Sequence, residues 1–290
     1  MNQKKCILRK ICVASLLFFG MFFLPQSFVR AEEEEGLPEE LPTDKYELYY
    51  EHPEGRGELK ENKNFIYCYN ETYKGIEILK YKKAGRKWKV KELKIPKQID
   101  NKPVTALADY SFFYCRYAKK VVLPKTVTDI GAMAFWACGV DSNSALRLEI
   151  PKNSRLKKIG GEAFAWSSIE LLKLPDSLQI IDGSFEGCGK LKKVILGKKT
   201  QLREMQSCFI ECKTLTEITI PKTVKKMGGT FSICPNLKKI TFQGAPPKYI
   251  FRSFNGIHPD AVFHVPKKYK KQYRKLLKKA EGYKSTMKIL

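Results

Sequence analysis

The apolar residues follow one another in the same order along most of the chain. In residues 220–237 an isoleucine and a proline precede a valine. A methionine follows three residues later with glycine after it, and phenylalanine and then cysteine complete the pattern. The phenylalanine recurs every 21 to 29 residues and marks the period. It stands at Phe112, Phe135, Phe164, Phe185, Phe209, Phe231 and Phe254.

This period predicts a solenoid, because self-similarity at roughly 20–29 residues is typical of leucine-rich repeats. Val90, Leu93 and Ile95 alternate with polar residues ahead of a proline, which suits the end of a strand because proline cannot donate to a ladder. A second extended piece, such as residues 127–130, is expected on the opposite side, and the phenylalanine lies in a tight turn or a single helical turn. We expect a β-rich α/β repeat solenoid. It would be a right-handed leucine-rich-repeat superhelix with a parallel strand ladder, an N-terminal β cap and a C-terminal helical cap.

The first 31 residues have the composition of a secretory signal peptide. Lys4, Lys5, Arg9 and Lys10 precede an apolar run over residues 11–24, and small or aliphatic residues follow near Ala31. The apolar run is short for a membrane span, although an uncleaved anchor stays an alternative. We therefore expect a secreted, extracellular protein without a transmembrane segment in the mature chain.

The rest of the chain divides by composition. Residues 32–64 are an acidic leader, which we expect to be mostly disordered; the alternative is an acidic arm that folds back on the basic body. Residues 65–92 are β-rich and predict the N-terminal cap, since a solenoid end needs an atypical unit. Residues 93–265 hold about seven coils, and residues 266–290 a basic capping helix and tail.

Several motifs together resemble the BspA-type leucine-rich repeat family. They are Ile95-Pro96, Asp100-Asn101-Lys102-Pro103-Val104, Ile130-Gly131, Ala134-Phe135-Trp136-Ala137-Cys138, Phe242-Gln243-Gly244-Ala245-Pro246-Pro247 and Val265-Pro266-Lys267-Lys268-Tyr269. The resemblance covers roughly residues 65–282. It implies a secreted or surface protein of the kind associated with adhesion to host matrix proteins and to cells. No wall-anchoring signal is recognisable, so free secretion and non-covalent retention at the cell surface both stay open.

The net charge of +24 points to acidic partners, and the expected export argues against nucleic acid. On the solvent side of the predicted ladder, six cations would form a basic stripe, which a bound polyanion would stabilise. The alternative is that they are ordinary solubilising residues with glutamates between them. Exposed aliphatic residues in the same sheet favour a protein-binding patch instead. The candidate face consists of Lys94, Lys120, Val122, Arg147, Leu171, Lys173, Lys193, Ile195 and Lys239.

A second basic surface is expected on the final helix, predicted over residues 267–280. Tyr269, Tyr273 and Ala280 fall on one side of it. The other side is either a solvated surface or a contact for a polyanion or a membrane surface. Its cations are Lys267, Lys268, Lys270, Lys271, Arg274, Lys275, Lys278 and Lys279.

Five cysteines occupy the same position of the repeat: Cys115, Cys138, Cys188, Cys212 and Cys234. We expect them to be buried and reduced. Coils about 4.8 Å apart would also allow Cys188–Cys212 or Cys212–Cys234 to bridge under oxidation. We recognise no catalytic constellation, metal-binding spacing or phosphate loop, and we expect neither a cofactor nor enzymatic activity.

Two functional hypotheses follow. The first is adhesin-like recognition of an extracellular or cell-surface protein of the matrix type through the solenoid sheet. The second is attachment to an anionic polymer of the envelope, such as a teichoic-acid-like polymer or a sulfated glycan, through the basic stripe and the final helix. Neither hypothesis predicts an oligomeric state. Salt separates them, because polyanion binding weakens steeply with ionic strength.

Overall fold

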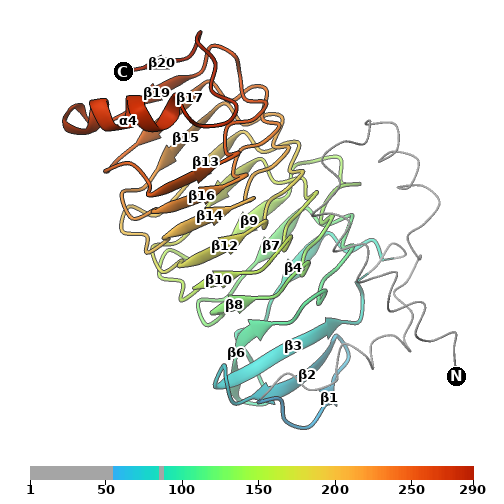
Figure 1. Ribbon diagram of the computed structural model, residues 1–290. Helices are drawn as coiled ribbons and strands as arrows, with labels where there is room; N and C mark the ends of the chain where they lie inside the picture. The colour runs from blue at the N-terminus through green and yellow to red at the C-terminus, as the bar shows by residue number, and fades with distance from the viewer. Residues whose placement is uncertain (1–54, 85–87) are drawn as a thin grey trace, which may run out of the picture. The chain divides into compact units, whose positions relative to one another are not determined.

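The computed structural model describes residues 55–84 and 88–290. Its contacts divide the chain into residues 1–45 and 46–290, and every described residue belongs to the second unit. The predicted signal peptide and most of the acidic leader lie outside the described residues. Within the described part, each coil contributes one short strand to each of two ladders, and the strands succeed one another from β3 to β20 (Figure 1).

The first ladder is parallel and confirms the predicted strands ahead of each proline. Leu93, Val121 and Leu148 are buried in it, and the residues on either side of each point outward. The strands are β4 (Glu92–Lys94), β7 (Lys120–Val122), β9 (Arg147–Glu149), β11 (Leu171–Lys173), β13 (Lys193–Ile195), β15 (Glu217–Ile220), β17 (Lys239–Phe242), β19 (Val262–His264) and β20 (Lys288–Ile289).

The second ladder carries the other extended piece of each coil, also in parallel register. Ile130, Ile159, Ile181 and Met205 are its buried residues in successive coils. Its strands are β6 (Lys102–Leu107), β8 (Asp129–Ile130), β10 (Lys158–Ile159), β12 (Ile180–Asp182), β14 (Glu204–Gln206), β16 (Lys226–Gly228) and β18 (Tyr249–Phe251). The expected parallel solenoid is therefore confirmed.

The first ladder changes register between β9 and β11. One residue lies between the buried Leu146 and the buried Leu148, whereas two lie between Leu215 and Ile218 in a later coil. An isolated bridge joins Leu146 to Ile169, and regular pairing resumes at β11. One residue fewer in a coil therefore divides the ladder into a three-stranded and a six-stranded sheet.

The N-terminal end begins earlier than the sequence indicates. β1 (Lys60–Glu61), β2 (Phe65–Asn70) and β3 (Gly75–Tyr81) form an antiparallel sheet whose last strand pairs in parallel with β6, and β5 (Gln98–Ile99) pairs antiparallel with β6. β1 thus lies within residues assigned to the leader. The reason is a buried ion pair: Arg56 binds both carboxylate oxygens of Glu77 at 2.7 and 2.8 Å, and the Asn70 amide donates to the same carboxylate.

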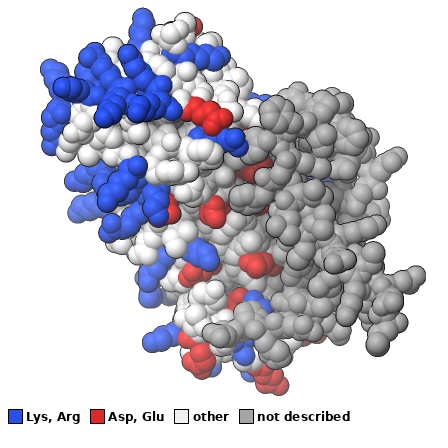
Figure 2. Space-filling view, in the orientation of Figure 1, with Lys and Arg blue, Asp and Glu red and all other residues white. Residues whose placement is uncertain are grey.

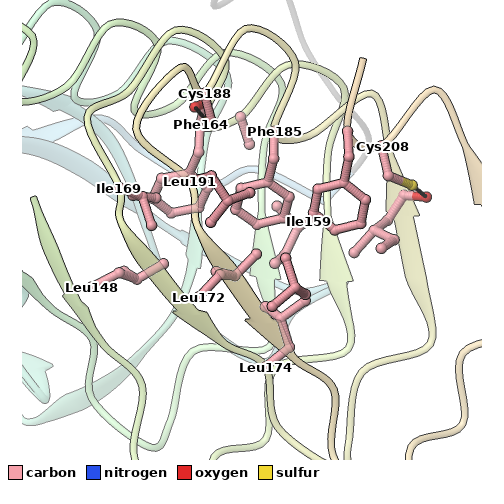
Figure 3. Close-up of a cluster of buried hydrophobic side chains, with 14 of the residues drawn as sticks. Leu148, Ile159, Phe164, Ile169, Leu172, Leu174, Phe185, Cys188, Leu191 and Cys208 are labelled. Atoms are coloured by element: carbon pink, nitrogen blue, oxygen red, sulfur yellow. Dashed lines mark hydrogen bonds between the residues drawn. The ribbon is translucent and has the colours of Figure 1, made fainter. Parts of the chain in front are cut away.

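The core is built around a stack of phenyl rings. The rings of the seven repeat phenylalanines lie 4.9 to 6.5 Å apart in successive coils and are nearly parallel. All seven side chains are buried. In Figure 3 the rings of Phe164 and Phe185 lie face to face, with Ile159, Leu172 and Leu191 around them. Aliphatic side chains of both ladders therefore pack against one continuous aromatic column.

Each phenylalanine lies in a tight turn, and no described residue of these turns is helical. The residues two before and two after it have positive φ in all seven turns, as in the pairs Glu162 and Trp166, and Gly229 and Ile233. The backbone N–H of each of the first six phenylalanines donates to a carbonyl of the next coil at 2.7–3.1 Å. These bonds fix the coil-to-coil distance at the turn.

Gly160 follows β10 directly, and its φ is not positive. A Cβ there would lie 2.8 Å from the backbone of Gly131 and Ala132 in the preceding coil. Glycine is required at this position because two backbones approach each other closely.

The helix at the C-terminal end is shorter than predicted. A 3₁₀ turn, η2 (Lys267–Tyr269), leads into α4 (Lys270–Leu277), and the tail returns to pair β20 with β19. Tyr273 of α4 is buried against Phe242, and its hydroxyl donates to the Gly244 carbonyl at 3.1 Å. In the described part of the chain, no helix has the length and apolar character needed to cross a membrane.

The phenyl column predicts a large loss of stability when one ring is removed. Phe185→Ala should lower the free energy of unfolding by about 3–5 kcal/mol, because the cavity lies between two stacked rings. Urea unfolding measures the loss. Phe251→Ala is the matched control, because that ring is 47% exposed, and it should change stability by less than about 1 kcal/mol. Equal losses in the two variants would contradict the role of the column.

Candidate binding surfaces

The outward side chains of the first ladder form what we call the ladder face. Its residues stand in two columns, one from the first and one from the third position of each strand. The first column contains Glu92, Lys120 and Arg147, then Leu171, Lys193, Glu217 and Lys239. The second contains Lys94, Val122 and Glu149, then Lys173, Ile195, Thr219 and Thr241.

The six predicted cations of this face do not stand in one row. Lys94 and Lys173 belong to the second column, and of the six only Lys120 and Arg147 face each other directly in the register. Lys120 lies 3.6 Å from the Glu92 carboxylate and 3.2 Å from that of Glu149. Lys239 lies 3.8 Å from Glu217. Glutamates of neighbouring strands, directly opposite as Glu92 and Glu217 or diagonal as Glu149, thus compensate part of the charge of the predicted stripe.

Two exposed aliphatic residues of the face lie on neighbouring strands. Leu171 and Ile195 are each 41% exposed, whereas Val122 is half-buried. Leu171 pairs with Lys193, and Lys173 pairs with Ile195. These four side chains form a square in which the two aliphatic residues lie on one diagonal and the two lysines on the other.

A more basic surface lies where the sequence analysis did not place it, on the loops after the prolines. Lys198 and Lys222 occupy these loops in successive coils, and Lys225 and Lys248 precede the strands that follow. We call the set the cationic edge; it consists of Lys198, Lys199, Arg203, Lys222, Lys225 and Lys248. Among the described residues, none of the six has a carboxylate within 4.0 Å.

The edge contains an open hollow of about 470 Å³. Lys198, Lys199 and Lys222 line it together with Thr223 and Gln243. The Lys225 ammonium donates to the Lys222 carbonyl at 3.0 Å, which fixes one more cation beside it. Three lysines around one depression are an arrangement that suits a single phosphate or sulfate group.

The final helix lies next to this edge. Tyr273 of α4 reaches the Gly244 carbonyl, and Gly244 packs so closely on Lys222 that a Cβ would lie 2.8 Å from the Lys222 Cα. Tyr273 and Leu277 are buried, so the apolar side of α4 is used in the fold. The predicted cations of this segment are exposed or half-buried, and none of them has a carboxylate partner among the described residues.

Figure 2 shows how the charged side chains are distributed over one side of the molecule. Lysine and arginine side chains gather over α4 and again below it on the same side, whereas acidic side chains are scattered over the rest of the coloured surface.

A sequence signal for this edge did exist: a lysine follows the proline or its glycine substitute at Lys97, Lys125, Lys152, Lys198, Lys222 and Lys267. Asp176 interrupts the series and accepts the Lys199 N–H.

The repeat cysteines are part of the core. All seven described cysteines are free and buried. Cys188, Cys212 and Cys234 each direct the thiol to a phenylalanine carbonyl of the preceding coil at 3.1–3.3 Å. Burial raises the pKa of the Cys188 and Cys234 thiols to about 12. They serve as small apolar residues with weak hydrogen bonds; Cys188 also contacts the Ser167 hydroxyl at 3.4 Å, and Cys234 the Ser232 carbonyl at 3.8 Å.

Three carboxylates lie near one another on the turns of successive coils. Burial, together with the neighbouring charges of Glu162 and Glu211, raises the pKa of Glu186 to about 7. Glu211 also lies 3.7 Å from the Lys213 ammonium. The described residues contain no group of three or more metal-ligating side chains arranged to hold an ion.

Comparison with known proteins identifies the repeat. The sequence profile of the BspA type leucine rich repeat region matches residues 84–146 and 141–257, in six copies. Among solved structures, the leucine-rich repeat protein of T. pallidum shares 22% identity, with a TM-score of 0.49, over 79% of this chain and 100% of that one. A leucine rich cell surface protein of Faecalibacterium prausnitzii A2-165 shares 21% identity, with a TM-score of 0.48, over 72% and 71%. A search of proteins with curated functions gives no match.

Because the described cysteines are buried and free, we predict that their thiols do not react in the folded protein. At pH 8 the seven described cysteines should stay unlabelled by an aromatic disulfide reagent, because each is buried and protonated. All should react after unfolding in urea, and mass spectrometry of peptides locates each label. Labelling of Cys212 in the folded protein, or a Cys188–Cys212 bridge in the isolated protein, would contradict this.

The carboxylates predict a pH dependence of stability. The pKa of Glu186 is higher in the folded than in the unfolded protein, so ionisation of this carboxyl destabilises the fold. The contribution of the protonated carboxyl to the free energy of unfolding is therefore complete below about pH 4.5 and is lost as the pH rises through about 7. Glu186→Gln should therefore stabilise the protein at pH 8 by roughly 1–3 kcal/mol and leave stability at pH 4.5 nearly unchanged. Urea unfolding at both pH values measures this. Glu71→Gln, on an exposed turn, should leave the pH profile unaltered; a stabilisation independent of pH would refute the assignment.

Proposed function

Because the chain belongs to the BspA-type leucine-rich repeat family, we propose that it is a secreted, non-enzymatic protein that binds a host or cell-surface protein through its ladder face. The family match covers more than half of the chain, and proteins of this repeat type are generally non-enzymatic. The binding role, the secretion and the choice of face are proposals.

The observation that carries the proposal is the square of Leu171, Lys173, Lys193 and Ile195. Two aliphatic side chains, each 41% exposed, stand on neighbouring paired strands: β13 is paired on both sides, and β11 is the first strand of the six-stranded sheet. Such side chains have little rotamer freedom to lose on binding, and their burial by a partner removes apolar surface from water.

The charges of the square indicate the chemistry of the partner. Lys173 and Lys193 have no carboxylate within 4.0 Å among the described residues, although Glu217 stands opposite Lys193 in the register. A partner that places aliphatic groups on Leu171 and Ile195 and carboxylates on the two lysines would complement all four. An exposed protein surface with mixed apolar and acidic residues offers both.

The competing hypothesis, polyanion binding along the ladder face, receives less support from the same geometry. Lys120 already has two glutamate partners and Lys239 one. A polyanion on this face would have to compete with those carboxylates and would bring its charges close to Glu149 and Glu217. Among the described residues, the cations of the cationic edge and α4 have no such partners, and on the ladder face the same holds for Lys173 and Lys193.

The test is binding to an immobilised matrix glycoprotein, such as fibronectin, at 50 and 500 mM salt. The double variant Leu171→Glu/Ile195→Glu should bind at least tenfold more weakly at both salt concentrations, because two apolar contacts of roughly 1 kcal/mol each are lost. Wild-type binding should change by less than about tenfold between the two salt concentrations.

Ile180→Glu is the matched control. Ile180 is 51% exposed but lies on β12 of the second ladder, so the same kind of substitution on that side should leave affinity unchanged. Circular dichroism should show the same fold for all variants. Equal weakening by Ile180→Glu, or binding that disappears at 500 mM salt, would refute recognition through the aliphatic square.

A further inference from the structure

We infer that the cationic edge and α4 form a second binding site, for a linear polymer that carries phosphate or sulfate groups. This site is separate from the ladder face and does not rest on the proposed function. It differs from the predicted stripe in its location, because it uses the loops after the prolines rather than the outward residues of the first ladder.

Within the part of the chain that the structure describes, the cations of the edge lack ion pairs as a set, whereas the two ladders mix paired cations with unpaired ones such as Lys173 and Lys193. On the ladder face, Lys120 and Lys239 have glutamate partners, and on the second ladder Lys226 pairs with Glu204 at 2.8 Å. The six cations of the edge have none among the described residues, and neither do those of the η2–α4 segment. Asp176, the acid that interrupts the lysine series of the edge, accepts the Lys199 backbone N–H and forms no ion pair with any of the six cations.

The repeat keeps these charges close together. Strands of successive coils are about 4.8 Å apart, so Lys198 and Lys222 start from neighbouring backbone positions. Like charges at this spacing repel each other even in water, at roughly 1 kcal/mol per pair. An anionic group bound between two lysines attracts both of them and offsets their mutual repulsion. The same favourable interaction can form at every coil that carries a lysine in this loop.

The hollow provides a specific place for one anionic group. Besides Lys198, Lys199 and Lys222 it is lined by Thr223, whose hydroxyl oxygen is buried without a hydrogen-bond partner in the described structure. The hydroxyl at the same position after the proline has a partner in other coils: Ser177 donates to the Ser154 carbonyl at 2.9 Å. In this coil the Thr223 hydroxyl has no partner among the described residues. A change of its rotamer would let it donate to an oxygen of the ligand.

The helix extends the site. Three coil steps separate the Lys198 loop from the loop that opens η2, a distance of about 15 Å, and α4 adds about 12 Å. The contact of Tyr273 with Gly244, which packs on Lys222, places α4 one coil beyond the hollow. A linear polymer could therefore bind in the hollow and continue over the cations of α4.

The same contacts argue against a membrane as the partner. Helices that bind membrane surfaces insert an apolar side, and here Tyr273 and Leu277 are buried in the solenoid. Anionic lipid would attract α4 only through charge. A flexible polymer can enter the hollow, whereas headgroups in a plane can reach only the outermost lysines.

The experiment measures binding of the purified protein to poly(glycerol phosphate), to heparin and to vesicles of phosphatidylglycerol and phosphatidylcholine. Affinity for one or both polymers should exceed that for vesicles. With about four anionic groups bound, affinity should fall by several hundredfold between 50 and 500 mM salt, by analogy with single-stranded nucleic acid. The two polymers distinguish phosphate from sulfate. Binding to vesicles alone, or to no polymer at 50 mM salt, would overturn the inference.

Charge-matched variants localise the site. Lys198→Gln/Lys199→Gln/Lys222→Gln should weaken polymer binding at least tenfold at 150 mM salt and make its salt dependence shallower. Lys94→Gln/Lys173→Gln/Lys193→Gln removes the same charge from the ladder face and should change affinity by less than about threefold. Equal effects would mean that net charge alone governs binding, and the inference would fail. Binding to a matrix glycoprotein through Leu171 and Ile195 is read out separately, so failure of one proposal leaves the other testable.

Discussion

The fold depends on the stacking of one phenylalanine turn on the next. The ring of each buried phenylalanine lies on that of the preceding coil, while its backbone N–H binds a carbonyl of the following one. Both contacts need the same coil spacing, and they tolerate coils of 21 to 29 residues because extra residues are accommodated outside the turn. The left-handed residues that flank each phenylalanine add strain, which the repeated hydrogen bonds and the continuous apolar column offset.

This stacking gives the two outer surfaces different chemistry. On the ladder face, register places side chains of neighbouring coils opposite each other, so that Glu92 and Glu149 stand beside Lys120. The loops after the prolines have no such pairing, and within residues 55–84 and 88–290 their lysines have no acidic partner. A rigid, partly compensated sheet with exposed Leu171 and Ile195 suits a protein ligand, whereas an uncompensated edge with a hollow suits an anionic polymer. A protein with both could hold an envelope polymer at the edge while the ladder face stays open.

Much of the fold could be predicted from the chain, because the repeat imposes a period that a single sequence reveals. The buried phenylalanines, the strands ahead of the prolines and the buried state of Cys188 and Cys212 follow from position within the repeat. The start of the ordered N-terminal sheet could not be predicted. Arg56 lies in an acidic stretch, and only the fold brings it to Glu77, 21 residues away. The final helix also differs from the prediction: residues 267–269 form a 3₁₀ turn, and α4 ends at the buried Leu277.

For the candidate surfaces, too, one part could be predicted from the sequence and another part only from the structure. The sequence by itself determined which residues face outward, because strand alternation and the proline positions are local properties. It therefore identified Leu171, Ile195 and the ladder lysines as exposed. Only the tertiary structure decided which of these residues are neighbours. The register places glutamates between the ladder cations, and the contact of Tyr273 with Gly244 brings α4 beside the loop of Lys222. Electrostatic pairing depends on distances between coils, and those distances are set by the stacking of the turns rather than by spacing along the chain.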